Sequence, residues 1–217
     1  MAAKTKISKD HKVEQILALL QKHYPDARCH LNFKNALELL IGTILAAQCT
    51  DARVNLVTPS LFRKYPNAKA FADADEETLQ DEIRSTGFFR NKAKSIRHCC
   101  QALVAQYGGE VPSDMKSLSA LSGVGRKTAN VVLGNYYGKP AIIVDTHMLR
   151  VAQRLGLTKE TDPTRMEMSL LKIIPDKQQT LFSNRIGEHG RTICQARKPK
   201  CEECFLKDLC TFYAKKS

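Results

Sequence analysis

A lysine that directly follows a glycine-containing turn is the residue in this sequence best suited to covalent chemistry. Lys127 comes after a polar turn that carries Gly123 and Gly125, and it precedes the apolar run 129–133. Glycine permits positive φ angles and close approach, and the first amides of a helix have no intrahelical partner, so this stretch favours a bound phosphate. The residues around Ser117 predict a short helix before the turn, with Ser117 as its N-cap.

The position of Lys127 at the start of a helix has a chemical consequence. The positive end of the helix dipole disfavours an ammonium group and favours the neutral amine, which is a nucleophile able to form a Schiff base. A surface lysine beside a bound phosphate explains the same pattern equally well. The residues of this stretch alone leave both interpretations open.

An acidic residue follows shortly afterwards in the chain. Asp145 ends the apolar run 141–144 and precedes a predicted helix over residues 146–155. A carboxylate at this place is expected to cap the helix by accepting a backbone N–H from its first turn. Such a cap keeps the group ionised, and an ionised carboxylate can also stabilise a developing positive charge in a reaction.

Four of the eight cysteines lie close together near the end of the chain, with the spacing C-x6-C-x2-C-x5-C. They are Cys194, Cys201, Cys204 and Cys210. Four thiolates within such a short segment indicate a metal site, for which zinc is the default. The spacing differs from the usual pair of Cys-x-x-Cys knuckles of zinc ribbons. The interval between the first two cysteines is basic and carries Arg197, Lys198 and Lys200, which either face solvent or contact phosphates.

The overall composition favours a polyanionic partner. The chain has 217 residues, a formal net charge of +12 and a pI near 9.4, a balance that points to nucleic acid. The charged first 14 residues do not resemble a signal peptide, and no apolar run reaches the length of a membrane span. The four scattered cysteines are expected to stay free in a reducing, cytoplasmic environment.

The hydrophobic periodicity is helical nearly everywhere, and alternating strand patterns are essentially absent. We therefore predict an all-α fold. The helices are expected over the following segments: from 13 to before Pro25, 37–45, 54–62 with a kink or late start at Pro59, 75–85, 93–107, 146–155, 163–174 and about 178–190.

Several motifs together resemble one family. The stretch 121–129 resembles the helix-hairpin-helix of DNA glycosylases of the endonuclease III branch, with Ser122 where that family usually has proline. Val144-Asp145-Thr146-His147 and the cysteine spacing match further motifs of the same family. The resemblance implies Lys127 as nucleophile, Asp145 as catalytic carboxylate and a 4Fe–4S cluster on the four cysteines. We leave His147 without a catalytic role.

The resemblance also implies two loops that enter DNA. Residues 46–51 match the turn whose glutamine, here Gln48, fills the gap left by a flipped nucleotide. Residues 87–93 match a second loop, in which Phe88 stands where the family usually has leucine, so a flat ring is available to stack in the gap. Without the resemblance, Gln48 is a polar residue at a helix end, and Phe88 or Phe89 is a core residue.

The family fold implies two all-α lobes with a cleft between them. One is a six-helix barrel over residues 29–139 that contains the hairpin, and the other joins residues 1–28 to 140–217 and carries the cluster loop. The implied function is that of a bacterial, cytoplasmic, monomeric base excision repair enzyme. It removes oxidised pyrimidines from duplex DNA and cleaves the abasic site by β-elimination. DNA contacts are expected from Gln48, Phe88, Gly123, Gly125, Arg126, Arg197, Lys198 and Lys200.

Two other functions remain possible at this point. A monofunctional glycosylase, such as the adenine-mismatch branch, lacks the lysine and carries a further C-terminal domain. A non-enzymatic hairpin module that only binds DNA needs no equivalent of Asp145.

Overall fold

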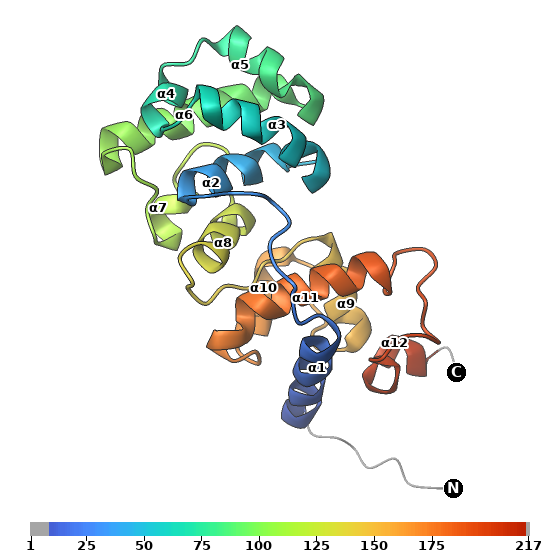
Figure 1. The fold of residues 1–217 in the computed structure, drawn as a ribbon. Coiled ribbons are helices and arrows are strands. Elements are labelled where there is room, and N and C mark those ends of the chain that lie inside the picture. Colours follow the sequence, from blue (N-terminus) through green and yellow to red (C-terminus); the bar gives the residue numbers. More distant parts are fainter. Residues whose placement is uncertain (1–8, 216–217) are drawn as a thin grey trace, which may run out of the picture. The chain divides into compact units, whose positions relative to one another are not determined.

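The computed structural model describes residues 9–215, and within them the chain is helical throughout, without strands (Figure 1). The all-α prediction is therefore confirmed. The helices are α1 (Lys9–His23), α2 (Ala36–Leu45), α3 (Asp51–Lys64), α4 (Ala68–Ala72), α5 (Glu76–Ile83), η1 (Arg84–Thr86), α6 (Phe89–Tyr107), α7 (Met115–Ser119), α8 (Arg126–Asn135), α9 (Thr146–Leu155), α10 (Pro163–Leu171), η2 (Asp176–Gln178), α11 (Gln179–Thr192), η3 (Lys207–Leu209) and α12 (Thr211–Ala214).

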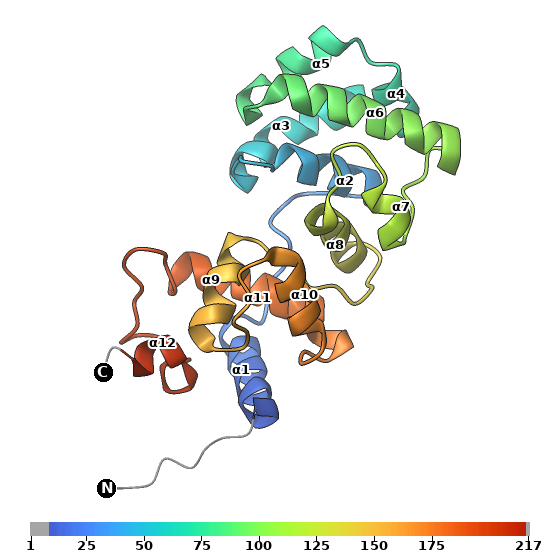
Figure 2. The same ribbon diagram turned by 180° about the vertical axis from the view of Figure 1, so that it is seen from behind.

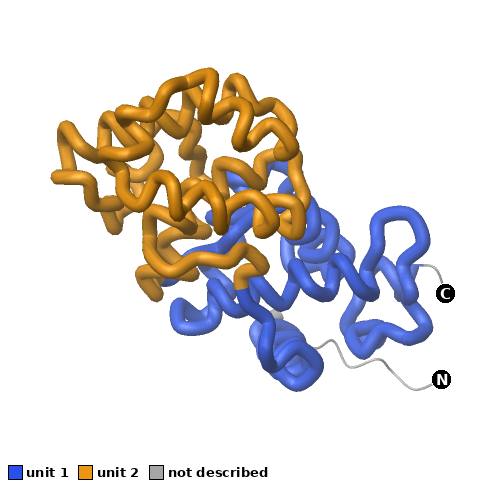
Figure 3. Tube along the Cα trace, turned by 45° about the horizontal axis from the view of Figure 1, so that its top comes forward, with its two compact units in different colours: residues 1–28, 140–217 blue, residues 29–139 orange. Residues whose placement is uncertain are grey.

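The chain divides into two compact units, coloured separately in Figure 3. One unit comprises Met1–Arg28 together with Pro140–Ser217, and the other is the continuous segment Cys29–Lys139. None of the helices in residues 9–215 is both long and apolar enough to cross a bilayer.

The continuous unit, Cys29–Lys139, is built around the buried helix α2. Eight of the ten residues of α2 are buried, as its nearly uniform apolar sequence predicts. Helices α4 and α5 pack against α6, while α2 contacts α3, α6 and α8, an arrangement that can be followed in Figures 1 and 2. The hairpin formed by α7 and α8 thus rests on the core of this unit.

The second unit joins the first described helix to the C-terminal helices. α1 and α9 both pack against α11, and α12 packs against α9. Their shared core is formed by aliphatic and aromatic side chains that include Ile16, Leu20, Val151, Phe182 and Ile186. Burying this apolar surface fixes the N-terminal helix to segments more than 120 residues later in the chain.

Most helix ends follow from their capping residues. Asp145 and Asp162 accept N–H groups from the first turns of α9 and α10, and Pro163 is the first residue of α10, as predicted. The short helix predicted before the hairpin is present as α7, but its predicted N-cap was wrong. Asp114, and not Ser117, is the N-cap of α7, because its side chain accepts the amide of Ser117.

Pro59 does not delay the start of α3. This helix begins at Asp51, after the N-cap Thr50, and contains Pro59 within it. The helix therefore accommodates proline in its C-terminal half, where the sequence pattern predicted a late start or a kink.

Candidate functional site

The hairpin between α7 and α8 is fixed by backbone hydrogen bonds and by one tight contact. The amide of Val124 donates to the carbonyl of Leu121 at 3.1 Å. Gly123 has φ +75°, and a Cβ at this position would lie 2.8 Å from Cβ of Ser95 in α6. Only glycine meets both conditions without strain, so the turn lies closely against α6.

Gly125 behaves differently from Gly123. Its φ is −89°, an angle that other residues also adopt. Of the two glycines of this hairpin, only Gly123 has a positive φ. Gly125 is the N-cap of α8 and brings no side-chain acceptor to the first turn of the helix. This helix start can therefore receive an external acceptor such as a phosphate oxygen.

Lys127 lies in the first turn of α8 and is exposed. Arg126 is the first residue of the same helix. Both residues therefore lie at the helix start that carries no side-chain cap.

Asp145 caps α9 with a direct hydrogen bond. Its Oδ1 accepts the amide of Met148 at 2.8 Å, and the residue is half-buried. The capping interpretation is confirmed, and it is compatible with a catalytic role. Asp145 belongs to the unit that contains α9, and Lys127 to Cys29–Lys139.

His147 has a structural environment. Its Nδ1 lies 3.2 Å from a guanidinium nitrogen of Arg150, and its ring packs so closely against Gly190 that a Cβ there would approach it to 2.7 Å. Burial is the main factor that lowers the pKa of His147, although Asp145 acts in the opposite direction. This packing agrees with leaving His147 without a catalytic assignment.

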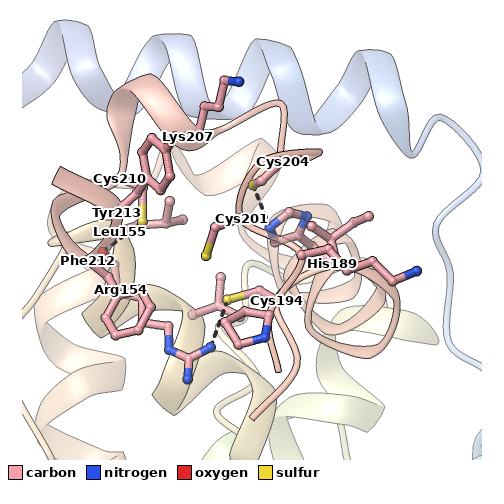
Figure 4. Close-up of a pocket in the computed structure, with 14 residues that line it drawn as sticks. Arg154, Leu155, His189, Cys194, Cys201, Cys204, Lys207, Cys210, Phe212 and Tyr213 are labelled. Carbon is pink, nitrogen blue, oxygen red and sulfur yellow. Dashed lines mark hydrogen bonds between the residues drawn. The ribbon is translucent and has the colours of Figure 1, made fainter. Parts of the chain in front are cut away.

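The four clustered cysteines line one pocket, in which their sulfur atoms surround a common space (Figure 4). Cys194 follows α11, Cys201 and Cys204 lie in the next loop, and Cys210 precedes α12. All four are free thiols in the structure. Backbone hydrogen bonds from Cys204 to Cys201 and from Lys207 to Cys204 fold this loop around the space.

The chemistry of this pocket fits a metal cluster. Burial, followed by the neighbouring thiols, raises the pKa of Cys204 to about 11, so ionising this thiol requires a nearby positive charge. Within the described residues, no group of three or more cysteine, histidine or acidic side chains is arranged to hold a single metal ion. Four cysteine sulfurs that surround one space fit an iron–sulfur cluster, whose iron atoms bind thiolates.

Arg154 of α9 connects the pocket to the basic loop. Its guanidinium group donates to Sγ of Cys194 at 3.4 Å and to the carbonyls of Gln195 and Ala196 at 2.7 and 2.9 Å. It also stacks over the ring of Phe212, 4.6 Å from the centroid. One side chain therefore neutralises a sulfur ligand and fixes the start of the loop at residues 195–200.

His189 of α11 closes the opposite side of the pocket. Its Nε2 lies 3.6 Å from Sγ of Cys204, and its Nδ1 lies 3.2 Å from the hydroxyl of Tyr24. Burial lowers the pKa of His189 to about 4, so the ring is neutral. In the tautomer in which Tyr24 donates to Nδ1, the Nε2–H group is directed at the sulfur of Cys204.

The basic side chains of the loop at 195–200 are exposed. Arg197, Lys198 and Lys200 all face solvent, while the loop base is held by Arg154 and by the bond from the Lys200 amide to the carbonyl of Ile193 at 3.0 Å. The predicted cationic loop is therefore a fixed feature, held from both the cluster side and α9.

Gln48 and Phe88 share an unusual backbone conformation. Gln48 has φ +53° and Phe88 has φ +49°, and among residues 9–215 they alone of the non-glycine residues have positive φ. Both are exposed, and Phe88 exposes 60% of its surface. The alternative in which Phe88 is a core residue is therefore wrong. Its neighbour Phe89 is half-buried beside the guanidinium of Arg84.

Sequence reasoning missed three residues that support these sites: Arg154, His189 and Lys92. Arg154 and His189 lie 40 and 15 residues from the cysteines that they contact, and neither belongs to a local motif. Lys92 is a buried lysine in α6, at 5% exposure. The one signal for Lys92 in the sequence is that this basic residue falls on the helix face that is predicted to be apolar.

The comparisons with known proteins agree with this site. Residues 41–176 match the HhH-GPD superfamily of base excision DNA repair proteins, and residues 194–210 match the iron-sulfur binding domain of endonuclease III. The first match includes the hairpin, Lys127 and Asp145, and the second contains all four clustered cysteines. Fold and site thus define a base excision DNA repair protein of the helix-hairpin-helix class with a 4Fe–4S cluster.

Relatives that match almost the whole chain identify its family more closely. Endonuclease III of Synechocystis sp. is 52% identical over 204 residues, which cover 94% of this chain and 93% of the relative. A non-covalent endonuclease III–DNA complex and a trapped endonuclease III–DNA covalent intermediate each superpose with a TM-score of 0.91 at 42% identity. Each match covers 97% of this chain and 99% of the other. The chain belongs to the endonuclease III family. It is a bifunctional DNA glycosylase and abasic-site lyase of base excision repair.

Proposed function

We propose that this chain excises oxidised pyrimidines from duplex DNA, with Lys127 as the attacking amine. The observation that carries the proposal is the position of Lys127 in the exposed first turn of α8, a helix without a side-chain cap. The positive end of this helix attracts the phosphate that would hold a damaged nucleotide beside the amine.

The reaction proceeds in two bond-breaking steps. Nζ of Lys127 attacks the sugar C1′, the C1′–N glycosidic bond breaks, and the base leaves with the bonding electrons and takes up a proton. The nitrogen then loses a proton, the C1′–O4′ bond breaks as O4′ takes up a proton, and a protonated Schiff base forms between Nζ and C1′. Loss of a proton from C2′ then expels the 3′ phosphate, which nicks the strand on the 3′ side of the lesion.

Asp145 stabilises the positive charge that develops on the sugar as the glycosidic bond breaks. Its hydrogen bond to the amide of Met148 limits the movement of the carboxylate. The same carboxylate can receive a proton from the attacking amine and return it to the leaving base.

Access to the base depends on the two exposed turns. A base inside a duplex is out of reach of Lys127, so the damaged nucleotide must be flipped out. Gln48 can donate and accept hydrogen bonds to the unpaired partner base, and the ring of Phe88 can stack in the gap. The exposure of both side chains supports these roles.

Phosphate contacts come from two further places. Gly123, Gly125 and Arg126 present the hairpin backbone to one phosphate, while Arg197, Lys198 and Lys200 contact others. Cys194, Cys201, Cys204 and Cys210 would hold the 4Fe–4S cluster, which when bound cross-links the chain on either side of the loop. Cluster binding is then part of the folding free energy of this segment.

The proposal extends to the organisation of the chain. Cys29–Lys139 corresponds to the six-helix barrel with the hairpin, and Met1–Arg28 with Pro140–Ser217 to the lobe of the cluster loop. The enzyme is expected to act as a monomer in the bacterial cytoplasm, in association with the nucleoid.

Borohydride trapping on duplex DNA tests this reaction. The wild-type protein, incubated with a thymine-glycol duplex and borohydride, is expected to form a covalent adduct, and Lys127→Ala is expected to form none. Lys116→Ala, which removes an exposed lysine from the neighbouring helix α7, is the matched control and should form as much adduct as the wild type. Base release without an adduct would reject the lysine mechanism, and excision confined to other lesions would reject oxidised pyrimidines as substrates.

A further inference from the structure

Two exposed turns of the Cys29–Lys139 unit hold non-glycine residues in the left-handed region. Gln48 follows α2, and Phe88 lies between η1 and α6. For a residue with a Cβ this conformation costs roughly 1–2 kcal/mol and persists only where the surroundings hold it. The two turns therefore need a fixed support.

Lys92 contacts the base of both turns. Its Nζ donates to the carbonyl of Leu45, the last residue of α2, at 2.7 Å, and to the carbonyl of Thr86, the last residue of η1, at 2.8 Å. Its backbone amide donates to the carbonyl of Phe88 at 3.1 Å. Lys92, in the first turn of α6, thus binds the chain at three places. The first is three residues before Gln48, the second is two residues before Phe88, and the third is Phe88 itself.

These contacts satisfy carbonyl groups that the helices leave open. In a continued α-helix, the amide of Cys49 would bond to the carbonyl of Leu45. It bonds instead to the carbonyl of Ala46, so the helical pattern of α2 does not supply a partner to the carbonyl of Leu45. The carbonyl of Leu45 instead accepts from an ammonium group at the negative end of the α2 dipole. Few side chains other than lysine can bring a charge to both carbonyls from α6.

The ammonium group is buried, with 5% of Lys92 exposed. Burial lowers the pKa of Lys92, and the nearby thiol of Cys49 acts in the opposite direction. A buried charge is expensive unless it is fully hydrogen-bonded, and removing it would leave two carbonyls without their partner. The interaction therefore holds the two turns firmly in one relative position.

We propose that Lys92 is a positioning residue that couples the Gln48 and Phe88 turns into a single rigid wedge for entering duplex DNA. The inference rests on the proposed function, in which these two side chains fill the gap beside the flipped nucleotide. Lys92 itself touches no DNA and no reacting atom. It acts by fixing the separation of the two turns and their left-handed conformations before DNA is bound. DNA binding then carries no entropy cost for ordering the two turns.

The test compares duplex with single-stranded abasic DNA, because a single strand offers no base stack to penetrate. Lys92→Met removes the ammonium and keeps an apolar chain, while Lys94→Met removes the same charge from an exposed position on α6. Under single-turnover conditions, Lys92→Met is expected to lose about 10- to 100-fold in the rate on duplex DNA. Its rate on the single strand, and both rates of Lys94→Met, should stay within about 2-fold of the wild type.

A fluorescent 2-aminopurine placed opposite the abasic site reports on the wedge directly. Wild type and Lys94→Met should raise its fluorescence on binding, and saturating Lys92→Met should raise it much less. If Lys92→Met does not fold, Lys92→Gln serves instead, since its shorter amide can reach at most one carbonyl. Equal loss on duplex and single strand, or unchanged duplex cleavage and fluorescence, would overturn the inference. Absence of trapping by the wild type would instead reject the proposed function.

Discussion

The guanidinium group of Arg154 lies 3.4 Å from Sγ of Cys194 and donates to the carbonyls of the two residues that follow this cysteine. The backbone carbonyl of Arg154 in turn accepts a hydrogen bond from the thiol of Cys210 at 3.2 Å. A single residue of α9 therefore contacts the first and last cysteines of the pocket and the start of the basic loop.

Arg154→Met is expected to weaken cluster binding by about 10- to 100-fold, because the sulfur loses its charged donor and the loop loses its anchor. The measurement is iron content and visible absorbance during dilution into a chelator. Arg165→Met, an exposed arginine of α10, is the control and should retain its iron. Equal retention by the two variants would show that Arg154 has no part in holding the cluster.

Asp145→Asn should separate the two roles of this side chain. Asparagine caps a helix about as well as aspartate, so the free energy of unfolding should change by less than about 0.5 kcal/mol. The carboxylate charge is lost, and base excision should fall by about 100-fold or more. Urea unfolding and single-turnover excision measure the two effects.

Asp145→Ala completes this comparison. It should lose both the activity and about 1 kcal/mol of stability, since alanine accepts no N–H group from the amide of Met148. Full activity in Asp145→Asn would mean that Asp145 acts only as a helix cap.

The two glycines of the hairpin are expected to respond differently to alanine. Gly123→Ala places a Cβ 2.8 Å from Ser95 at a φ of +75°, which should cost about 2 kcal/mol or more. Gly125→Ala meets no atom within 4 Å and has a negative φ, so it should cost less than about 1 kcal/mol. Urea unfolding measures both values.

DNA affinity provides the second measurement on Gly125→Ala. The added methyl group faces the expected phosphate position, so the stable variant should bind DNA more weakly than the wild type. Unchanged affinity would mean that the phosphate does not approach this residue.

Neutralising the loop at 195–200 should alter the salt dependence of DNA binding. In the triple variant Arg197→Gln, Lys198→Gln, Lys200→Gln, the slope of log K against log salt should fall by about 0.9 for each phosphate that the loop no longer neutralises. The control replaces Lys159, Lys172 and Lys177 by glutamine, which removes the same charge from exposed positions of the same unit. If both variants reduce the slope equally, the loop contributes only net charge.

The sequence by itself determined the features that depend on neighbouring residues. The helical period predicted an all-α chain, Asp145 and Asp162 predicted two helix starts, and Gly156 predicted the end of α9. The spacing of Cys194, Cys201, Cys204 and Cys210 predicted the cluster loop. These signals are local, because capping bonds and metal loops join residues only a few positions apart. The N-cap of α7 is the exception, because the sequence analysis assigned it to Ser117 and the structure has Asp114.

Only the tertiary structure decided which distant residues support those motifs. Lys92 bonds to Leu45 across 47 positions, and Arg154 reaches Cys194 across 40. Such partners are selected by the packing of helices, which brings together side chains that no periodicity or spacing relates. The left-handed conformations of Gln48 and Phe88 have the same origin, since neither residue type prefers positive φ and the surrounding structure must hold it.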